Sequence, residues 1–211
     1  MRKLILSVLL VVALAVPALA EDKVPNGCDP LYQDIADNAL VSFEGTGDLD
    51  VLVVTDPLCW HCRLGHKLLS EYPEKYRTVK LSFFPRRTFI GSDMAAWILE
   101  DAVGKDDLLD KLDFAYKHLK QPKTDDVAEA RMVVLSQFIV FFPQMLGADE
   151  SIEALYARLQ KEHEPHTLQS SALAHSAKIP GTPVLVAGEK VLIGYGAGPW
   201  LKALDANAIC K

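Results

Sequence analysis

The sequence has few cysteines, no excess of positive charge and, beyond its first twenty residues, no long apolar run. Four cysteines in 211 residues are too few for a small scaffold in which disulfides replace a hydrophobic core. The 28 acidic and 22 basic side chains give a formal charge of −6, which disfavours binding to a phosphate backbone, so we expect no nucleic-acid partner. The longest later apolar segment, residues 132–146, is interrupted by Ser136 and Pro143 and is shorter than the ~20 residues that span a bilayer.

Internal repeats and low-complexity linkers are also absent. Half of the residues are hydrophobic, which suffices for a packed core and argues against wholesale disorder. Because a single domain typically contains ~100–200 residues, we expect one domain over residues 21–211.

The first twenty residues have the pattern of a cleaved secretory signal. Arg2 and Lys3 precede an apolar run at residues 4–16, and Ala18-Leu19-Ala20 supplies a small-x-small cleavage site. The run is shorter than a membrane span, so an uncleaved anchor is the weaker interpretation. We therefore expect residues 1–20 to be removed after Ala20 and the protein to be periplasmic, in a compartment where disulfides persist.

The rest of the chain alternates predicted strands and helices. The run at residues 50–55 is short, apolar and rich in β-branched side chains, as is typical of a central strand covered on both faces. Glycines and prolines break the helical period of residues 92–177 into several segments. The predicted elements are, in order, a helix at 31–40, a strand at 50–55, a helix at 59–72, a strand at 79–83, the helical stretch at 92–177, a hairpin of strands 184–187 and 191–195, and a final helix that begins near Pro199.

This order predicts the fold class. Strands lie on both sides of a long helical stretch, so an α/β fold with an inserted helical subdomain, at about residues 86–178, is expected. We interpret the helical block as an insertion into one fold, since no linker separates it from the strands.

The most informative motif is Cys59-Trp60-His61-Cys62, directly after the predicted central strand and at a helix start. Unsatisfied N–H groups and a partial positive charge at a helix N-terminus stabilise a thiolate, which is the attacking species in disulfide exchange. We expect Cys59, at the exposed end, to be the nucleophile. Cys62, one turn inward, is placed to close a disulfide with it and release a mixed-disulfide partner. His61 is expected to stabilise the anion further.

The pKa of Cys59 decides the direction of exchange. Each unit of depression favours the reduced form by ~1.4 kcal/mol, equivalent to ~30 mV of potential. A depression of several units predicts a donor of disulfides, whereas a nearly normal pKa predicts a reductant.

Other uses of two cysteines two residues apart are less well supported. A structural zinc site usually needs a second such pair, which the sequence lacks, and a c-type haem site needs histidine where Arg63 stands. Copper binding by Cys59 and Cys62 with His61 or His66 stays open as an alternative, as does a non-catalytic module that binds client proteins.

Several motifs together resemble a known family, in the right order along the chain. They are Val54-Thr55-Asp56-Pro57-Leu58-Cys59-Trp60-His61-Cys62, Phe84-Pro85-Arg86 with Ser92-Asp93, Gly181-Thr182-Pro183 and Gly194-Tyr195. This set resembles the catalytic domain of bacterial thiol-disulfide interchange proteins of the DsbC/DsbG type, in the thioredoxin superfamily. The likeness covers about residues 50–92 and 178–204 and is weak through the helical block. It implies a thioredoxin-like fold.

The resemblance also implies roles for individual residues. Cys59 would be the nucleophile and Cys62 the resolving thiol, with Pro183 a cis-proline facing them. The backbone of Thr182 would pair with an extended substrate strand, and Trp60 would lie at the surface in contact with a partner. Clients would be unfolded or misoxidised secreted proteins, and a membrane or periplasmic redox partner would recycle the dithiol. Neither a metal nor an organic cofactor would be required.

The motif details do not separate an oxidase from an isomerase. His61 before the second cysteine is similar to DsbA-type oxidases, whereas Thr182 before the proline is similar to the isomerase branch. Thioredoxin-type reductases carry an acid six residues before the nucleophile, where this sequence has Val53. Little sequence precedes the first catalytic strand, and we expect a monomer.

The remaining two cysteines, Cys28 and Cys210, stand near opposite ends of the mature chain. In an oxidising compartment we expect them to form a structural disulfide, because domain termini often lie close together. An intermolecular disulfide or a second exchange pair is the alternative.

Three further features have a structural and a functional interpretation. The apolar segment 132–145 is expected to form a buried helix, and its functional alternative is that Phe141, Phe142 or Met145 hold client proteins near Cys59. His66 is interpreted as a histidine on a helix surface. The cluster at residues 162–166 resembles a metal site by composition but is interpreted as a polar helix end.

Overall fold

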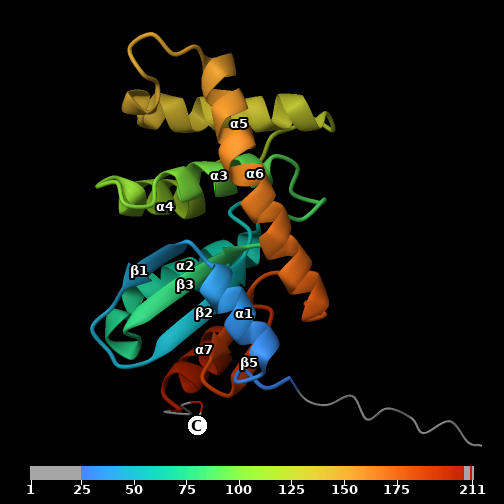
Figure 1. The fold of residues 1–211 in the computed structure, drawn as a ribbon. Coiled ribbons are helices and arrows are strands. Elements are labelled where there is room, and N and C mark those ends of the chain that lie inside the picture. The colour runs from blue at the N-terminus through green and yellow to red at the C-terminus, as the bar shows by residue number, and fades with distance from the viewer. Residues whose placement is uncertain (1–24, 207–209, 211) are drawn as a thin grey trace, which may run out of the picture.

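The computed structural model describes residues 25–206 and residue 210. The predicted signal and its cleavage site lie outside the described residues. The predicted α/β class is confirmed: a five-stranded mixed sheet is covered by helices on both faces (Figure 1).

The sheet has the order β1-β3-β2-β4-β5, with β2 at its centre. Neighbouring strands run antiparallel except β2 and β3, which are parallel. The strands are β1 (Val41–Glu44), β2 (Asp50–Thr55), β3 (Thr78–Phe83), β4 (Val184–Ala187) and β5 (Lys190–Ile193).

Seven α-helices lie in the described part of the chain. They are α1 (Pro30–Asn38), α2 (Trp60–Glu71), α3 (Ser92–Asp101), α4 (Leu108–Lys117), α5 (Val127–Phe141), α6 (Ile152–Ser176) and α7 (Ala197–Leu204). Short 3₁₀ turns at Pro73–Lys75 and Pro143–Met145 follow α2 and α5.

The alternation of side chains along β2 builds two hydrophobic layers. Val51 and Val53 belong to the larger core, which also contains Leu68 of α2 and Trp200 of α7. Leu52 and Val54 point to the opposite face, into a smaller core. That core contains Tyr32, Ile35, Phe84, Ala174, Ile179, Val184 and Val186. Because successive strand residues face opposite sides, one strand that is buried from Val51 to Thr55 anchors α2 and α7 on one face and α1 and α6 on the other.

A block formed by α3, α4, α5 and the first half of α6 sits above the sheet (Figure 1). Its buried side chains, including Trp97 and Phe138, are continuous with the larger core of the sheet. The long helix α6 passes from this block down to the smaller core (Figure 1). The four helices between β3 and β4 therefore extend one core rather than forming a second one.

Several predicted boundaries need correction. The strand β1 was not predicted, because four residues at a sheet edge give little periodic signal. The strand β5 ends at Ile193 rather than at residue 195, since Gly194 adopts a left-handed conformation with φ of 82°. Helix α7 begins at Ala197, ahead of Pro199.

The interpretation of residues 162–166 as a helix end is wrong. Pro165 lies inside α6, which continues to Ser176. Buried residues before and after the proline, Leu159 and Thr167, pack against the rest of the protein. Tertiary packing therefore outweighs the loss of one helical hydrogen bond at the proline.

Cys28 and Cys210 form a disulfide, with their Cα atoms 5.4 Å apart. The bond joins the segment before α1 to the end of the chain across 182 residues of sequence. No helix among the described residues combines the length and the apolar character needed to cross a membrane.

Candidate active site

The site begins where β2 ends and α2 starts. Cys59 is the N-cap residue of α2, with an extended backbone and no side-chain hydrogen bond that caps the helix. Its carbonyl accepts the N–H of Arg63 at 3.1 Å, so the helix is hydrogen-bonded from this residue onward. The positive end of α2 therefore lies at the Cys59 sulfur.

Cys59 and Cys62 are free cysteines and both are buried, with 4% and 2% of their surfaces exposed. The expectation that Cys59 lies at an exposed end is wrong. Trp60, which is 65% exposed, and His61 are the parts of the motif that face solvent. The ring of His61 has no hydrogen-bond partner among the described residues, and its backbone N–H is the part that stabilises Cys59.

The loop before β4 covers the two thiols. The peptide bond between Thr182 and Pro183 is cis, and the Sγ atom of Cys59 lies 3.6 Å from the carbonyl oxygen of Thr182. The N–H of Gly194 donates to the carbonyl of Pro183 at 2.8 Å, which ties this loop to the end of β5. The sheet thus brings together segments that are 123 residues apart in sequence.

The pKa values of the two thiols are shifted in opposite directions. The Cys62 thiol and nearby backbone N–H groups lower the pKa of Cys59 to about 5, against the opposing effect of burial. Burial raises the pKa of Cys62 well above its ordinary value. The hydroxyl of Thr182 is buried beside the thiols, and hydrogen bonding to it lowers the pKa of both. At neutral pH the reduced protein therefore carries a thiolate on Cys59 and a thiol on Cys62.

Asp56 is a residue of the site that the sequence analysis did not identify. It is fully buried, and its carboxylate accepts hydrogen bonds from the N–H groups of Leu58 and Arg86 and from the hydroxyl of Ser92. It thereby joins the loop before Cys59 to the loop after β3. Burial raises the pKa of Asp56 to about 7, with a smaller contribution from Cys59. In the sequence, the Asp56-Pro57 pair directly after a predicted buried strand could have pointed to this residue.

Arg63 is a second residue that was missed as part of the site. Its guanidinium donates to the carbonyl of Pro57, just before the motif, and to the carbonyl of Leu119, just after α4. A half-buried cation therefore joins the helical block to the loop that carries Cys59. Its second partner lies 56 residues away in sequence, so local pattern could not identify the contact.

His66 is not on a helix surface, which corrects the prediction. It is 8% exposed and stacks on Tyr116 of α4, with 4.5 Å between the ring centroids. The Tyr116 hydroxyl in turn forms a hydrogen bond of 2.9 Å with the hydroxyl of Thr55 at the end of β2. The Nε2 atom of His66 lies 3.5 Å from a carboxylate oxygen of Asp113. His66 thus packs between α2 and α4, and this placement does not support it as a copper ligand beside the cysteines.

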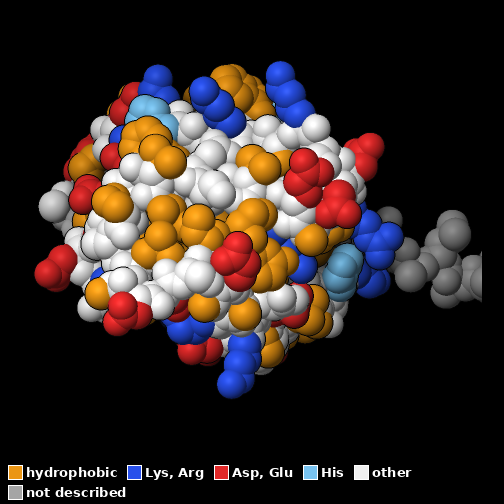
Figure 2. All heavy atoms as spheres, turned by 90° about the horizontal axis from the view of Figure 1, so that it is seen from above, with side chains coloured by type: hydrophobic (Ala, Val, Ile, Leu, Met, Phe, Trp, Pro, Cys, Tyr) orange, Lys and Arg blue, Asp and Glu red, His pale blue; other side chains and the backbone are white. Residues whose placement is uncertain are grey.

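The apolar segment that ends α5 is only partly buried. Val134 and Phe138 face the core, whereas Val140 and Phe141 are exposed, Phe141 at 61%. Phe142 and Met145 pack against the core. Hydrophobic side chains accordingly gather near the centre of the view from above, over the block that contains α5 (Figure 2). The prediction of a buried helix therefore holds for one face of α5.

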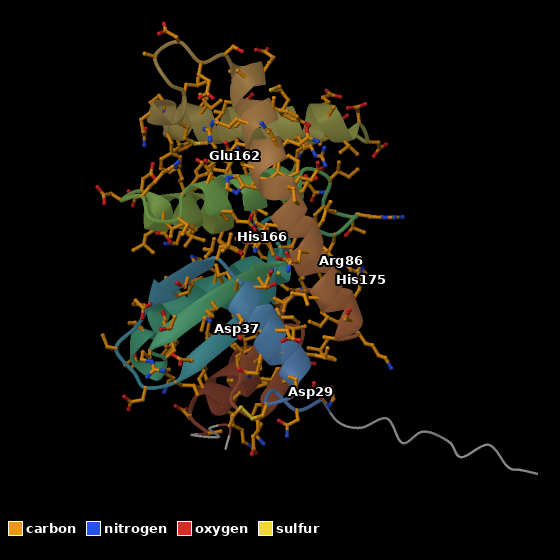
Figure 3. The ribbon with its side chains drawn as sticks, in the orientation of Figure 1. Asp29, Asp37, Arg86, Glu162, His166 and His175 are labelled. Carbon is orange, nitrogen blue, oxygen red and sulfur yellow. A yellow bond between two sulfur atoms is a disulfide. The ribbon has the colours of Figure 1, made fainter. Side chains whose placement is uncertain are left out.

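The residues around His163 form a charged network between α3 and α6. Asp101, Glu162 and His163 offer ligand atoms within 4.8 Å of one another. Arg158 and Lys105 already pair with Asp101, at 2.8 and 2.6 Å. Glu162 and His166 lie in the upper and middle parts of α6, and His166 donates to or accepts from Glu100 at 2.9 Å (Figure 3). This arrangement fits a network of ion pairs that fastens α6 to α3.

No known family model and no curated protein matches this chain. Solved structures are similar to it. A thioredoxin-like oxidoreductase from Silicibacter pomeroyi is 20% identical, with a TM-score of 0.58 over 82% of this chain and 96% of that one. The thiol-disulfide exchange protein alpha-DsbA2 from Wolbachia pipientis is 13% identical, with a TM-score of 0.60 over 85% and 94%. The catalytic domain of Proteus mirabilis ScsC is 16% identical, with a TM-score of 0.60 over 86% and 96%.

These likenesses establish the fold. The chain has a thioredoxin-like fold with additional helices between β3 and β4. At such low identity a shared fold does not separate DsbC/DsbG-type proteins from DsbA-type ones.

Proposed function

We propose that this protein is a thiol-disulfide oxidoreductase that exchanges disulfides with polypeptide substrates through Cys59 and Cys62. The observation that carries the proposal is a pair of free thiols at a helix start, one of low and one of high pKa, beneath a cis Thr182–Pro183 bond. A thioredoxin-like fold supports it by analogy.

The proposed reaction starts from the oxidised protein. A substrate thiolate attacks the Cys59 sulfur, the Cys59–Cys62 bond breaks, and Cys62 leaves as a thiolate that takes up a proton. A second substrate thiolate then attacks the substrate sulfur of the mixed disulfide and displaces the Cys59 thiolate. The substrate loses two electrons and gains a disulfide, while the protein gains two electrons and becomes a dithiol. A second protein that carries a disulfide would accept these electrons and restore the starting state.

The low pKa of Cys59 favours the oxidase direction. A thiolate that is stable at neutral pH is a good leaving group, which speeds its release from the mixed disulfide. Stabilisation of the thiolate also stabilises the reduced protein, so the oxidised protein is a stronger acceptor of electrons. We therefore favour an oxidase over an isomerase.

Substrate recognition is proposed to use Thr182 and Trp60. The carbonyl of Thr182 lies beside the Cys59 sulfur, where an extended substrate backbone would pass. Trp60 is the large exposed side chain next to the nucleophile. Neither contact depends on a particular substrate sequence, which suits unfolded polypeptides.

Export to the periplasm and action as a monomer are part of the proposal. The signal pattern of residues 1–20 supports export, and the disulfide between Cys28 and Cys210 is of a kind that persists outside the cytosol. Unfolded secreted proteins would be the substrates.

The test is oxidation of a reduced dithiol protein by the purified protein. Cys59→Ser should abolish the reaction, and Cys28→Ser with Cys210→Ser should preserve it. Circular dichroism would verify that each variant is folded. Turnover by a folded Cys59→Ser variant would refute the proposal. Equilibration with glutathione would then give the potential, and a value as reducing as that of thioredoxin would exclude an oxidase.

A further inference from the structure

The loops around the two thiols differ in charge from the rest of the chain. The chain as a whole has more acidic than basic residues. In contrast, residues 84–91, 118–124, 177–183 and 194–196 contain no Asp or Glu. Their basic residues are Arg86, Arg87, Lys120, Lys123 and Lys178.

Hydrogen bonds place these loops around the site. The N–H of Arg86 donates to Asp56, three residues before the nucleophile. The side chain of Gln121 donates to the carbonyl of Thr88, which ties the second loop to the first. Arg63 ties that second loop to α2 through the carbonyl of Leu119. The loops that carry Arg86, Arg87 and Lys120 are thus joined to one another and to the segments that flank Cys59.

These cations have no acidic partner. In the described part of the chain, Arg86, Arg87 and Lys120 make no ion pair, whereas Lys105, Lys111, Arg131 and Arg158 in the helical block all do. Asp56, which accepts the N–H of Arg86, is fully buried and accepts two further hydrogen bonds.

Of the acids that follow the second loop, Asp126 and Glu129 are engaged, whereas Asp125 is exposed. Asp126 caps α5 by accepting the N–H of Glu129, and Glu129 accepts the hydroxyl of Thr124. Arg87 and Lys120 are exposed, and the Arg86 guanidinium lies 4.7 Å above the ring of Phe84. Arg86 and His175 lie together beside the lower half of α6 (Figure 3), and basic side chains gather beside a histidine at the right-hand edge of the view from above (Figure 2).

We propose that Arg86, Arg87 and Lys120 form a basic rim that selects substrates with acidic residues close to the reacting cysteine. This inference rests on the proposed function and names its substrate class. Unpaired cations at the mouth of a site raise the local concentration of anionic partners and speed their association, by ten-fold or more at low salt. An acidic polypeptide segment would pair with the rim while its cysteine reaches Cys59. Salt should weaken this selection, because the rim is exposed.

The experiment uses three synthetic dithiol peptides that differ only in the residues flanking their cysteines, which are acidic, neutral or basic. The oxidised protein should oxidise the acidic peptide about ten-fold faster than the neutral one at low salt, in terms of kcat/KM, and the basic peptide more slowly. High salt should bring the three rates together. The double variant Arg87→Gln, Lys120→Gln should reduce the ratio of acidic to neutral rates to nearly one.

The matched control is Lys161→Gln. Lys161 is an exposed residue of α6 that also has no ion pair in the described chain, so its replacement should leave the ratio unchanged. Equal rates for all three peptides, or an unchanged ratio in the double variant, would overturn the basic rim while the proposed function stands. Failure to exchange with any peptide and with a small uncharged disulfide would instead overturn the proposed function.

Discussion

The protein contains two pairs of cysteines in two different states. Cys28 and Cys210 are joined near the two ends of the described chain, whereas Cys59 and Cys62 are free thiols at the start of α2. The first pair closes a long loop. The second pair lies at a helix N-terminus beneath the loop that holds Thr182.

The difference between the pairs comes from their surroundings. A helix N-terminus, a neighbouring thiol and a buried hydroxyl all stabilise a thiolate on Cys59. Cys28 and Cys210 lie outside the helices, on segments that the fold brings together. We therefore propose that the first pair stabilises the fold and that the second carries out disulfide exchange.

The largest expected effect is on turnover. Cys62→Ser leaves the nucleophile in place but removes the thiol that resolves the mixed disulfide. Turnover should be lost because the variant cannot form the Cys59–Cys62 disulfide. Its Cys59 thiolate should still attack disulfide-bonded substrate proteins and accumulate mixed disulfides that dithiothreitol releases. Mass spectrometry after alkylation would detect them. Catalytic oxidation by Cys62→Ser at the normal rate would contradict the assigned role.

The second effect is on stability alone. Replacing both Cys28 and Cys210 by Ala should lower the free energy of unfolding by about 3–5 kcal/mol, because the disulfide closes a loop of 182 residues. Denaturant titration would measure the loss. The same variant should keep the Cys59 titration unchanged, and a shift in that titration would show that the two pairs are coupled.

A third effect concerns the pH dependence of stability. The pKa of Asp56 is raised to about 7 in the folded protein from an ordinary value near 3.8, so the folded state binds more protons between these values. Asp56 therefore contributes stability that is fully present below pH 4 and is lost as the pH rises towards and through 7.

Asp56→Asn should remove that contribution. Denaturant unfolding of the oxidised protein at several pH values would test this, because the Cys59 thiolate is then absent. The loss of a carboxylate that accepts three hydrogen bonds should also destabilise the variant at all pH values. If the free energy of unfolding of Asp56→Asn varied with pH as steeply as that of the unmodified protein, the raised pKa of Asp56 would be contradicted.

The smallest effect is expected from Arg63. Arg63→Gln removes a half-buried positive charge from the loop that carries Cys59 and should raise the pKa of that thiol by roughly half a unit. Arg63→Lys should restore most of the effect, and Lys67→Gln, at an exposed position on the same helix, should have none. A structural role alone would change stability without moving the titration.

The parts of the fold that local pattern encodes were predicted from the sequence. The apolar run of β2 and the CxxC motif at a helix start indicated a strand followed by a catalytic turn, and residues 50–55 match β2. The α/β class with inserted helices followed from the order of these elements. The edge strand β1 and the path of α6 through Pro165 depend on packing with distant segments, so local periodicity did not reveal them.

Long-range contacts explain what was missed in the site. Asp56 joins two loops, Arg63 reaches Leu119, and His66 packs on Tyr116. The contacts of Arg63 and His66 depend on how the helical block sits on the sheet, whereas Asp56 joins loops that follow the neighbouring strands β2 and β3. Burial of Cys59 also depends on a contact between distant segments, because the loop with Thr182 covers it.

Titration of the Cys59 thiolate in the reduced protein tests the central claim most directly. Ultraviolet absorbance would follow the thiolate as the pH is varied, with Cys59→Ser as the blank. We expect a midpoint near pH 5, with Cys62 remaining a thiol through neutral pH. A midpoint near the ordinary thiol value of ~8.5 would contradict it.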